Sequence, residues 1–291
     1  MTEIEFSGGE SGGAPRRVAI VGLGLMGGSL ARALRASAAP PHVVGWSYTA
    51  AEGEAALAAG VVERIATGVD DAVDGADLVV LATPVESIVA MLGRFTSVLA
   101  RVPAVTDLAS VKGPVMAAAR AAGLTDRFVG GHPLAGRHER GFAASRAELY
   151  QDALVYLVQE AEYATQAMRT VAAMWRSVGA RPRVVDAAAH DTLLAWTSHL
   201  PQAVAFALGA ALSAADVRVD ELGPGGLDTT RLAASPSQLW ADIFLHNTAA
   251  LAEPLKRLRE HIALIEQALV EEDVATLLAL FEASSRWRDT P

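Results

Sequence analysis

The sequence predicts an α/β protein with a Rossmann-type, doubly wound parallel sheet in its N-terminal part and an all-helical C-terminal part. Three observations support this prediction. From Arg17 to about Arg183, short apolar runs alternate with segments of helical periodicity. A glycine-rich turn follows the first run, and the strand signal vanishes after Asp186. We therefore expect a flexible Gly/Ser-rich tail over residues 1–14, a sheet domain over 15–185 and a helical domain over 186–291.

Seven buried strands are expected in the sheet domain. Near-continuous apolar runs are typical of parallel strands that are covered by helices on both faces. The intervening segments carry apolar residues at three- and four-residue spacing, which predicts helices over residues 29–37, 87–100 and 165–177. The expected strands cover residues 18–21, 43–46, 78–82, 104–106, 128–129, 154–158 and 184–185.

The C-terminal part is expected to consist of long Ala/Leu-rich helices, broken at residues 223–226 and at Pro236. The helix expected over residues 187–214 is apolar almost all round, which the surface of a monomer would not tolerate. An intramolecular core is one explanation. We favour a subunit interface in addition, so that the helical domain is a dimerisation domain and the protein a homodimer.

Composition excludes several classes of protein. The chain has 291 residues, 52% of them hydrophobic, and a formal net charge of -9, which is no electrostatic footprint for nucleic acid. With no cysteine, neither a disulfide scaffold nor a thiolate nucleophile is available. The start of the chain has neither the basic region nor the apolar core of a signal peptide. The strongly apolar stretch at residues 203–212 has about half the length that a membrane-spanning helix needs. We expect a cytoplasmic protein without nucleic-acid or membrane partners.

The turn after the first strand has the pattern of a dinucleotide-binding loop, G-x-G-x-x-G, and it opens a helix. Gly22 permits the tight turn, Gly24 lets the backbone approach a pyrophosphate, and Gly27 allows close packing of helix and strand. The helix N-terminus then offers unpaired N–H groups to the anion. The sheet domain is therefore predicted to bind a dinucleotide. The remaining expected contacts are Leu25 and Met26 in the loop and Thr83 after the third expected strand.

The end of the second expected strand bears on the choice of cofactor. NAD-preferring domains place an acidic residue about 20 residues past the glycines, where it binds the ribose hydroxyls. Ser47 occupies that position here, followed by Tyr48 and Thr49. Because no carboxylate is expected there to repel a 2′-phosphate, NADP is favoured over NAD. No arginine lies in this loop, so we expect the preference to be weak.

Four further segments combine polar residues with turn or helix-break signals. Pro133 directly follows His132, so the imidazole is held rigidly at the carboxyl edge of the sheet, where open sheets bind their ligands. Taken singly, each segment has a bland explanation, such as helix packing for His190 and His199 or a surface charge for Arg231. The four segments are residues 106–113, 130–141, 190–202 and 225–240.

Together these segments resemble the prephenate and arogenate dehydrogenases, from about residue 17 to beyond residue 247. The motifs Ser-Val-Lys-Gly, Gly-His-Pro-x-Ala-Gly, His-Asp…Ser-His-Leu-Pro and Asp-x-Thr-Arg…Trp occur in the family's order and at nearly its spacing. The resemblance implies oxidative decarboxylation of prephenate or arogenate with hydride transfer to NAD(P)+. The product is then 4-hydroxyphenylpyruvate or tyrosine.

The resemblance also implies roles for individual residues. His132 holds and accepts the proton of the substrate's ring hydroxyl, Ser110 hydrogen-bonds beside it, and Arg231 pairs with a substrate carboxylate. The residue types suit these roles, because histidine has an unperturbed pKa of about 6.5 and a planar guanidinium binds both carboxylate oxygens. No metal-ligand cluster is evident. Further residues implied to bind the substrate are His138, His190, His199, Gln202, Asp228 and Trp240.

The sequence departs from the family pattern at two substrate positions. Many members carry an acidic residue where this chain has His138, with Glu139 one step later, and the usual Leu-Pro-His is Leu-Pro-Gln at Gln202. Both positions belong to the region that handles the substrate side chain. The pyruvyl group of prephenate and the amino-acid group of arogenate are therefore not distinguished.

Three alternatives remain open. A dehydrogenase of 3-hydroxy acids or imines shares the two-domain plan, but it usually relies on a lysine in the helical domain. The lysine after Lys112 is Lys256, which we expect on a solvated helix face. A relative acting on 4-amino-4-deoxyprephenate in secondary metabolism would share every motif. A catalytically inactive NADP-binding sensor would not need both His132 and Arg231.

Overall fold

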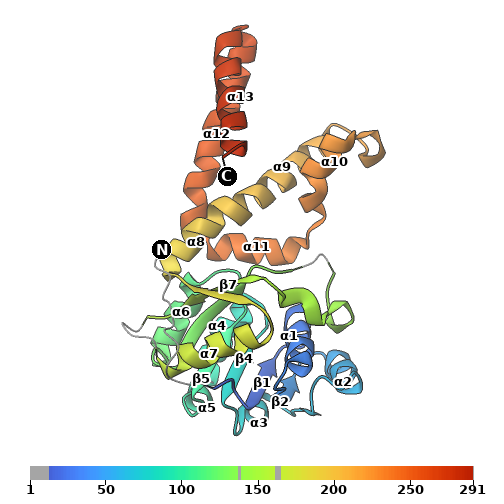
Figure 1. Cartoon of the computed structure of the whole chain (residues 1–291). Helices are drawn as coiled ribbons and strands as arrows, with labels where there is room; N and C mark the ends of the chain where they lie inside the picture. The colour runs from blue at the N-terminus through green and yellow to red at the C-terminus, as the bar shows by residue number, and fades with distance from the viewer. Residues whose placement is uncertain (1–12, 137–138, 161–164, 291) are drawn as a thin grey trace.

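The centre of the N-terminal part is an eight-stranded sheet in the order β3-β2-β1-β4-β5-β6-β7-β8 (Figure 1). The structure, a computed structural model, describes residues 13–136, 139–160 and 165–290. All neighbouring strands are parallel except β6 and β7, which pair antiparallel. The strands are β1 (Arg17–Val21), β2 (His42–Trp46), β3 (Arg64–Ile65), β4 (Leu78–Leu81), β5 (Ala104–Asp107), β6 (Phe128–Pro133), β7 (Leu154–Val158) and β8 (Arg181–Val184).

The expected doubly wound sheet is confirmed, with four differences in detail. Strand β8 covers Arg181–Val184 and not residues 184–185, because Arg181 and Arg183 interrupt the apolar run. Strand β3 was not expected, because its two residues, Arg64 and Ile65, form no apolar run. Strand β6 is longer than expected and includes His132, since the two glycines at residues 130–131 carry no apolar signal. The antiparallel direction of β7 was also not expected, because an apolar run is the same in either direction.

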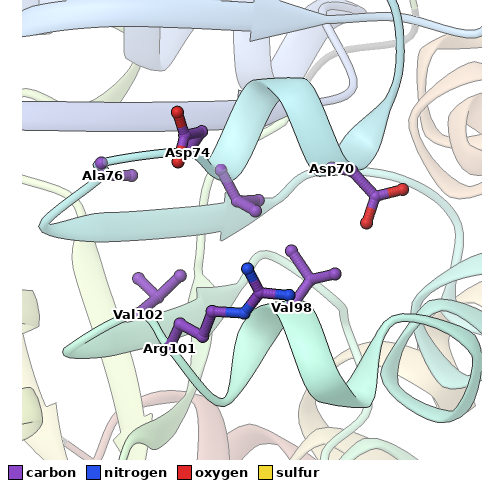
Figure 2. A pocket seen from close by; sticks show the side chains of 8 residues that line it. Asp70, Asp74, Ala76, Val98, Arg101 and Val102 are labelled. Atoms are coloured by element: carbon purple, nitrogen blue, oxygen red, sulfur yellow. The ribbon is translucent and has the colours of Figure 1, made fainter.

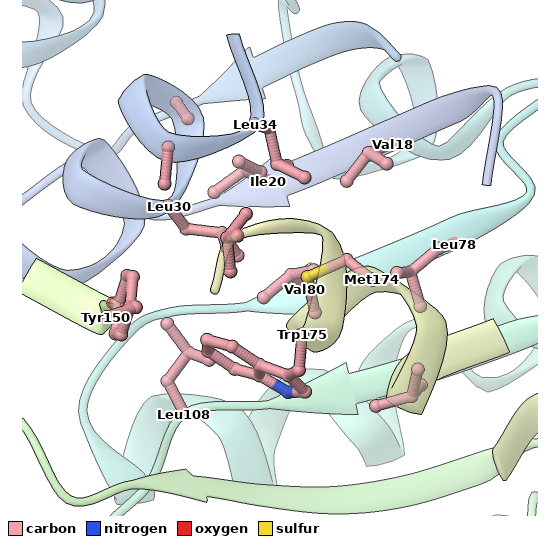
Figure 3. Close-up of a cluster of buried hydrophobic side chains, with 14 of the residues drawn as sticks. Val18, Ile20, Leu30, Leu34, Leu78, Val80, Leu108, Tyr150, Met174 and Trp175 are labelled. Atoms are coloured by element: carbon pink, nitrogen blue, oxygen red, sulfur yellow. The ribbon is translucent and has the colours of Figure 1, made fainter. Parts of the chain in front are cut away.

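Helices cover both faces of the sheet, and alternate residues of β1 belong to two separate cores. Val18 and Ile20 pack with residues of α1, η2 and α7, among them Trp175 (Figure 3). Ala19 and Val21 pack on the opposite face with α3, α4, α5 and α6. The helices of this part are α1 (Leu25–Ala36), α2 (Ala50–Ala58), α3 (Val69–Val73), α4 (Val85–Arg94), α5 (Thr96–Leu99), α6 (Gly113–Ala121), α7 (Gln166–Ser177) and the 3-10 turns η1 (Phe142–Ala144) and η2 (Ala147–Tyr150).

The C-terminal part is helical, as expected. The helix expected over residues 187–214 is present as α8, a π-helical turn η3 and α9. Helices α9 and α12 extend away from the sheet in different directions, whereas α11 lies across it (Figure 1). The elements are α8 (Ala187–Leu194), η3 (Ala195–His199), α9 (Leu200–Ala214), η4 (Val219–Glu221), α10 (Pro224–Thr230), η5 (Arg231–Ala234), α11 (Ser237–His246), α12 (Thr248–Val270) and α13 (Val274–Arg288).

The projecting helices bury little of their apolar surface within one chain. In α9 only Gln202 and Ala205 are buried, and α13 buries no residue. Val270 is 81% exposed and Trp287 is 76% exposed. An intramolecular core therefore does not account for the apolar character of these helices. None of the helices in the described ranges has the length and apolar character that crossing a membrane requires.

Candidate active site

The glycine loop between β1 and α1 has the geometry expected of a phosphate-binding turn. Gly22 has φ +103°, and a Cβ there would lie 2.6 Å from the carbonyl oxygen of Ala82. A Cβ on Gly27 would lie 1.9 Å from the carbonyl oxygen of Gly22. Gly24 is the N-cap of α1, where a Cβ would approach only a Glu52 oxygen, at 3.6 Å. The middle glycine thus leaves the backbone accessible, while the outer two permit the turn.

The residues around this loop fit a nicotinamide dinucleotide. Within the described residues, no side chain caps the N-terminus of α1, so the N–H groups of its first turn remain available to an anion. Leu25, Met26 and Thr83 line one cavity beside it. The Thr83 hydroxyl is buried, and it has no hydrogen-bond partner among the described residues. A buried polar atom of this kind is normally satisfied, and a bound nucleotide would supply its partner.

This cavity, of about 280 Å³, lies at the carboxyl edge of the sheet, under α11. It brings together Ser110, from the loop after β5, and His132, near the end of β6, as expected. Arg140 and Asp242 also line it. Neither was predicted as a site residue, because Arg140 lies in the segment 130–141 but outside its family motif, and Asp242 lies outside all four segments. The cavity therefore contains the cofactor loop, a histidine and charged side chains together.

A second, smaller hollow of about 140 Å³ lies between α3 and α5 (Figure 2). Asp70, Asp74 and Arg101 line it. The residues that line this hollow directly precede β4 and β5, so the hollow lies at the amino edge of the sheet. Since open parallel sheets bind ligands at the carboxyl ends of their strands, we do not place the active site there.

Behind His132, three side chains form a hydrogen-bonded chain. His132 Nδ1 lies 2.8 Å from His190 Nε2, and His190 Nδ1 lies 2.7 Å from Asp191 Oδ1. The carboxylate of Asp191 also accepts from the backbone N–H groups of Lys112 at 2.8 Å and Gly113 at 2.7 Å. This arrangement ties α8 to the start of α6.

The chain determines which nitrogen of His132 carries the proton. A carboxylate only accepts, so Asp191 requires the proton of neutral His190 on Nδ1. His190 Nε2 is then an acceptor, which places the proton of His132 on Nδ1. The Nε2 lone pair of His132 remains unprotonated. A histidine in this tautomer can accept a proton from a bound hydroxyl group.

Burial and charge keep His132 neutral. The pKa of His132 is well below its usual 6.5, mainly because the ring is buried and secondarily because His190 and Lys112 lie near it. Burial alone would raise the pKa of Asp191, but hydrogen bonds from His190 and from the backbone of Lys112 and Gly113 lower it overall. At neutral pH the chain therefore consists of a charged carboxylate and a neutral His132.

A buried ion pair supports the loop that carries Ser110. The Lys112 ammonium, which is fully buried, donates to Asp107 and to the carbonyl oxygen of Gly131 at 2.7 Å. Asp107 also accepts from the backbone N–H groups of Gly131 and Ala109, both at 2.9 Å. The pair therefore joins the end of β5 to β6 directly before His132. Lys112 lies in the Ser-Val-Lys-Gly motif, but this ion pair was not predicted.

Several residues implied for the substrate site support it from behind. His190 and His199 are buried and do not line the cavity. His199 Nδ1 lies 3.1 Å from Asn247 Nδ2, and its ring packs edge-on against Trp240 with centroids 6.1 Å apart. Burial lowers the pKa of His199 to about 4, against the opposing charge of Asp191. The ring is therefore neutral and part of the packing between η3 and α11.

The other implied substrate residues lie outside the cavity in a single chain. Gln202 donates to the carbonyl oxygen of Leu232 at 2.7 Å, so it ties the turn after Arg231 to α9. Arg231 is exposed and lines a separate wide groove, of about 1290 Å³, between α9 and α10. Asp228 is exposed on α10. His138 and most of the tail over residues 1–14 lie outside the described residues.

The expectation that no carboxylate lies at the end of β2 is wrong. Ser47 donates a hydrogen bond of 3.0 Å to Oε2 of Glu52, in the first turn of α2. Glu52 was not predicted at this position, because it is five positions beyond Ser47 and only the first turn of α2 brings it back to the strand end. The residues at the end of β2 therefore do not support a preference for NADP.

The protein has the features of a nucleotide-dependent oxidoreductase. These are a Rossmann-type sheet, a glycine loop before an uncapped helix N-terminus, and a neutral buried histidine in the same cavity. Comparisons with known proteins identify the family. The model of the prephenate dehydrogenase nucleotide-binding domain matches residues 30–184. The model of the prephenate dehydrogenase dimerization domain matches residues 186–283. The chain belongs to the prephenate dehydrogenase family.

Individual relatives cover nearly the whole chain. Cyclohexadienyl dehydrogenase from Zymomonas mobilis is 33% identical over 94% of this chain and 95% of its own length. The crystal structure of prephenate dehydrogenase from A. aeolicus with hydroxyphenyl propionate and NAD+ has a TM-score of 0.85 and 29% identity, covering 94% of this chain and 98% of its own. Arogenate dehydrogenase from Synechocystis has a TM-score of 0.79 and 26% identity, and the match covers 94% of this chain and 99% of its own. The expected family is confirmed, and the protein is a dehydrogenase with a nucleotide-binding and a dimerization domain.

Proposed function

We propose that the protein oxidatively decarboxylates prephenate or arogenate, with a nicotinamide dinucleotide as the hydride acceptor. The observation that carries this proposal is the hydrogen-bonded chain behind His132. It leaves Nε2 of a neutral histidine as a proton acceptor in the cavity that the cofactor loop lines. Relatives named for cyclohexadienyl, prephenate and arogenate substrates support this substrate class.

The reaction needs a base for the ring hydroxyl. A nicotinamide held by the glycine loop would supply the acceptor for the hydride that leaves C4 of the cyclohexadienol. His132 Nε2 accepts the hydroxyl proton as the C4–H bond breaks, and Ser110 hydrogen-bonds the same oxygen. The bond between C1 and the carboxylate then breaks, carbon dioxide leaves, and the bonding electrons complete the aromatic ring. His132 returns its proton to the ring oxygen, so the base is regenerated.

The second subunit is part of the proposal. Arg231 anchors a substrate carboxylate by its planar guanidinium, although in one chain it lies outside the cavity. We infer that dimer assembly through the helical domain completes the substrate site. The exposed apolar surface of α9, α12 and α13 supports a homodimer, because such a surface is stable only when it is covered.

The proposal is tested by the formation of reduced nicotinamide with prephenate and with arogenate, each against NAD+ and NADP+. Turnover of at least one pair is expected. His132→Ala should lower kcat by about 100-fold or more and leave KM nearly unchanged, because the proton transfer is an interaction of the transition state. No turnover with any pair, or a His132→Ala enzyme with near-normal kcat, would contradict the proposal.

A further inference from the structure

The end of β2 lies directly beside the glycine loop. Trp46, the last residue of β2, pairs with Val21, the last residue of β1. The backbone N–H of Gly22 donates to the carbonyl oxygen of Trp46 at 2.7 Å. Ser47 therefore follows the strand at the level where the loop turns toward its ligand. In a dinucleotide-binding domain this position faces the ribose next to the adenine.

Glu52 brings a carboxylate to this position. Its Oε2 accepts a hydrogen bond from the Ser47 hydroxyl at 3.0 Å, and its Oε1 lies 3.6 Å from the place of a Cβ on Gly24. The same oxygen lies 3.5 Å from the place of a Cβ on Gly141. Glu52 is half-buried in the first turn of α2, where the helix dipole favours a negative charge. The carboxylate thus lies between the end of β2 and the middle glycine of the loop.

No positive charge in this segment offsets that carboxylate. Residues 43–63 contain neither lysine nor arginine. The next basic residue, Arg64, is paired with Asp71 at 2.8 Å and also donates to the Asp71 carbonyl oxygen. Ser47 directs its hydroxyl proton to Glu52 and not outward. A 2′-phosphate would therefore meet a carboxylate and an occupied donor.

We propose that Glu52 selects NAD over NADP by accepting hydrogen bonds from the adenosine ribose hydroxyls and by repelling a 2′-phosphate. This assignment rests on the proposed dehydrogenase function. A charged acceptor forms a strong hydrogen bond with a hydroxyl group, whereas two negative groups at contact distance repel each other. Glu52 thereby takes the role that an acidic residue at the strand end has in other NAD-binding domains.

Isothermal titration calorimetry of the intact protein with NAD+ and with NADP+, without substrate, tests this role. We expect the unaltered protein to bind NAD+ about 10-fold or more tightly than NADP+. Glu52→Gln, which keeps the shape and removes the charge, should shift the affinity ratio toward NADP+ by about 10-fold or more. Glu54→Gln is the matched control, because it removes one exposed charge from the same helix and should leave the ratio unchanged.

A second variant protects the test against misfolding of the first. Ser47→Ala leaves the carboxylate in place and should retain the preference for NAD+. Tighter binding of NADP+ than of NAD+ by the unaltered protein, or a preference for NADP+ in Ser47→Ala, would overturn the role of Glu52 and leave the dehydrogenase function standing. Equal shifts of the affinity ratio in Glu52→Gln and Glu54→Gln would also overturn the role of Glu52. Binding of neither nucleotide would overturn the proposed function itself.

Discussion

His132 and His190 face each other through their ring nitrogens at 2.8 Å, although they are separated by more than fifty positions in the chain. The rings meet edge to face, with centroids 5.0 Å apart. Asp191 fixes the proton of His190, and His190 in turn fixes the proton of His132. The reactivity proposed for His132 thus depends on a residue that does not line the cavity.

Replacing His190 should impair catalysis without removing the base. His190→Leu leaves the buried Nδ1–H of His132 without an acceptor, which costs about 1–3 kcal/mol. We expect kcat to fall by about 10- to 100-fold, with a smaller change in KM. His190→Gln offers an amide oxygen to the same N–H and should recover part of the loss. Equal kcat values for the two variants would show that the hydrogen bond has no role, and nitrogen-15 NMR of His132 would report the tautomer directly.

The acid limb of the pH profile should lie below the usual range for histidine. His132 acts as a base only when neutral, and burial lowers its pKa well below 6.5. As the pH falls, kcat/KM should therefore persist through pH 6.5 and be lost only at the lower pKa of the folded protein. Steady-state kinetics across the acid range measure this limb. A limb at or above pH 6.5 would contradict the assignment of the base.

Lys112→Met should strongly destabilise the protein. The substitution leaves the Asp107 carboxylate buried without its partner, and breaking one side of a buried ion pair costs about 3–5 kcal/mol. Denaturant unfolding measures the loss. Lys256→Met is the control, because Lys256 is exposed and its ion pair with Glu260 is long, at 3.9 Å. The double change Asp107→Asn with Lys112→Met should lose less than the sum of the single changes.

Arg231→Ala should raise KM and largely spare kcat. If Arg231 pairs with a carboxylate present in both the substrate and the transition state, its loss removes a charge-assisted bond worth about 1.5–3 kcal/mol. We expect KM to rise by about 10- to 100-fold. Arg218→Ala serves as the control, since Arg218 lines the same groove but is paired with Asp220 at 2.7 Å. A KM that changes equally in the two variants would remove Arg231 as the anchor.

Sedimentation should show a dimer. Covering apolar surface gains about 25 cal/mol per Å², and α13 buries none of its residues within one chain. The exposed side chains include Leu269, Val274 and Phe281. A stable monomer at micromolar concentration would contradict both the dimer and the completed substrate site. Activity that rises with protein concentration in the range of dimer dissociation would support the link between them.

Local sequence determined the elements and the cofactor loop. Strand β1, the turn at Gly22 and the start of α1 follow from neighbouring residues, because turn geometry and apolar periodicity act over a few positions. His132 was placed at the carboxyl edge of the sheet for the same reason. The joint motifs were sufficient for the family, which the comparisons confirm.

Tertiary structure alone decided which side chains meet. The pairing of His132 with His190 requires that α8 pack against α6 and the end of β6, and no local pattern encodes that packing. Glu52 reaches Ser47 because the first turn of α2 reverses the direction of the chain. A carboxylate therefore lies at the end of β2, where the local sequence predicts none. Arg231 lies in a separate groove of the single chain because α9 carries it away from the sheet, so its motif could not indicate its distance from His132. Sequence spacing limits which residues are neighbours along one element, whereas contacts between elements depend on how their buried faces fit together.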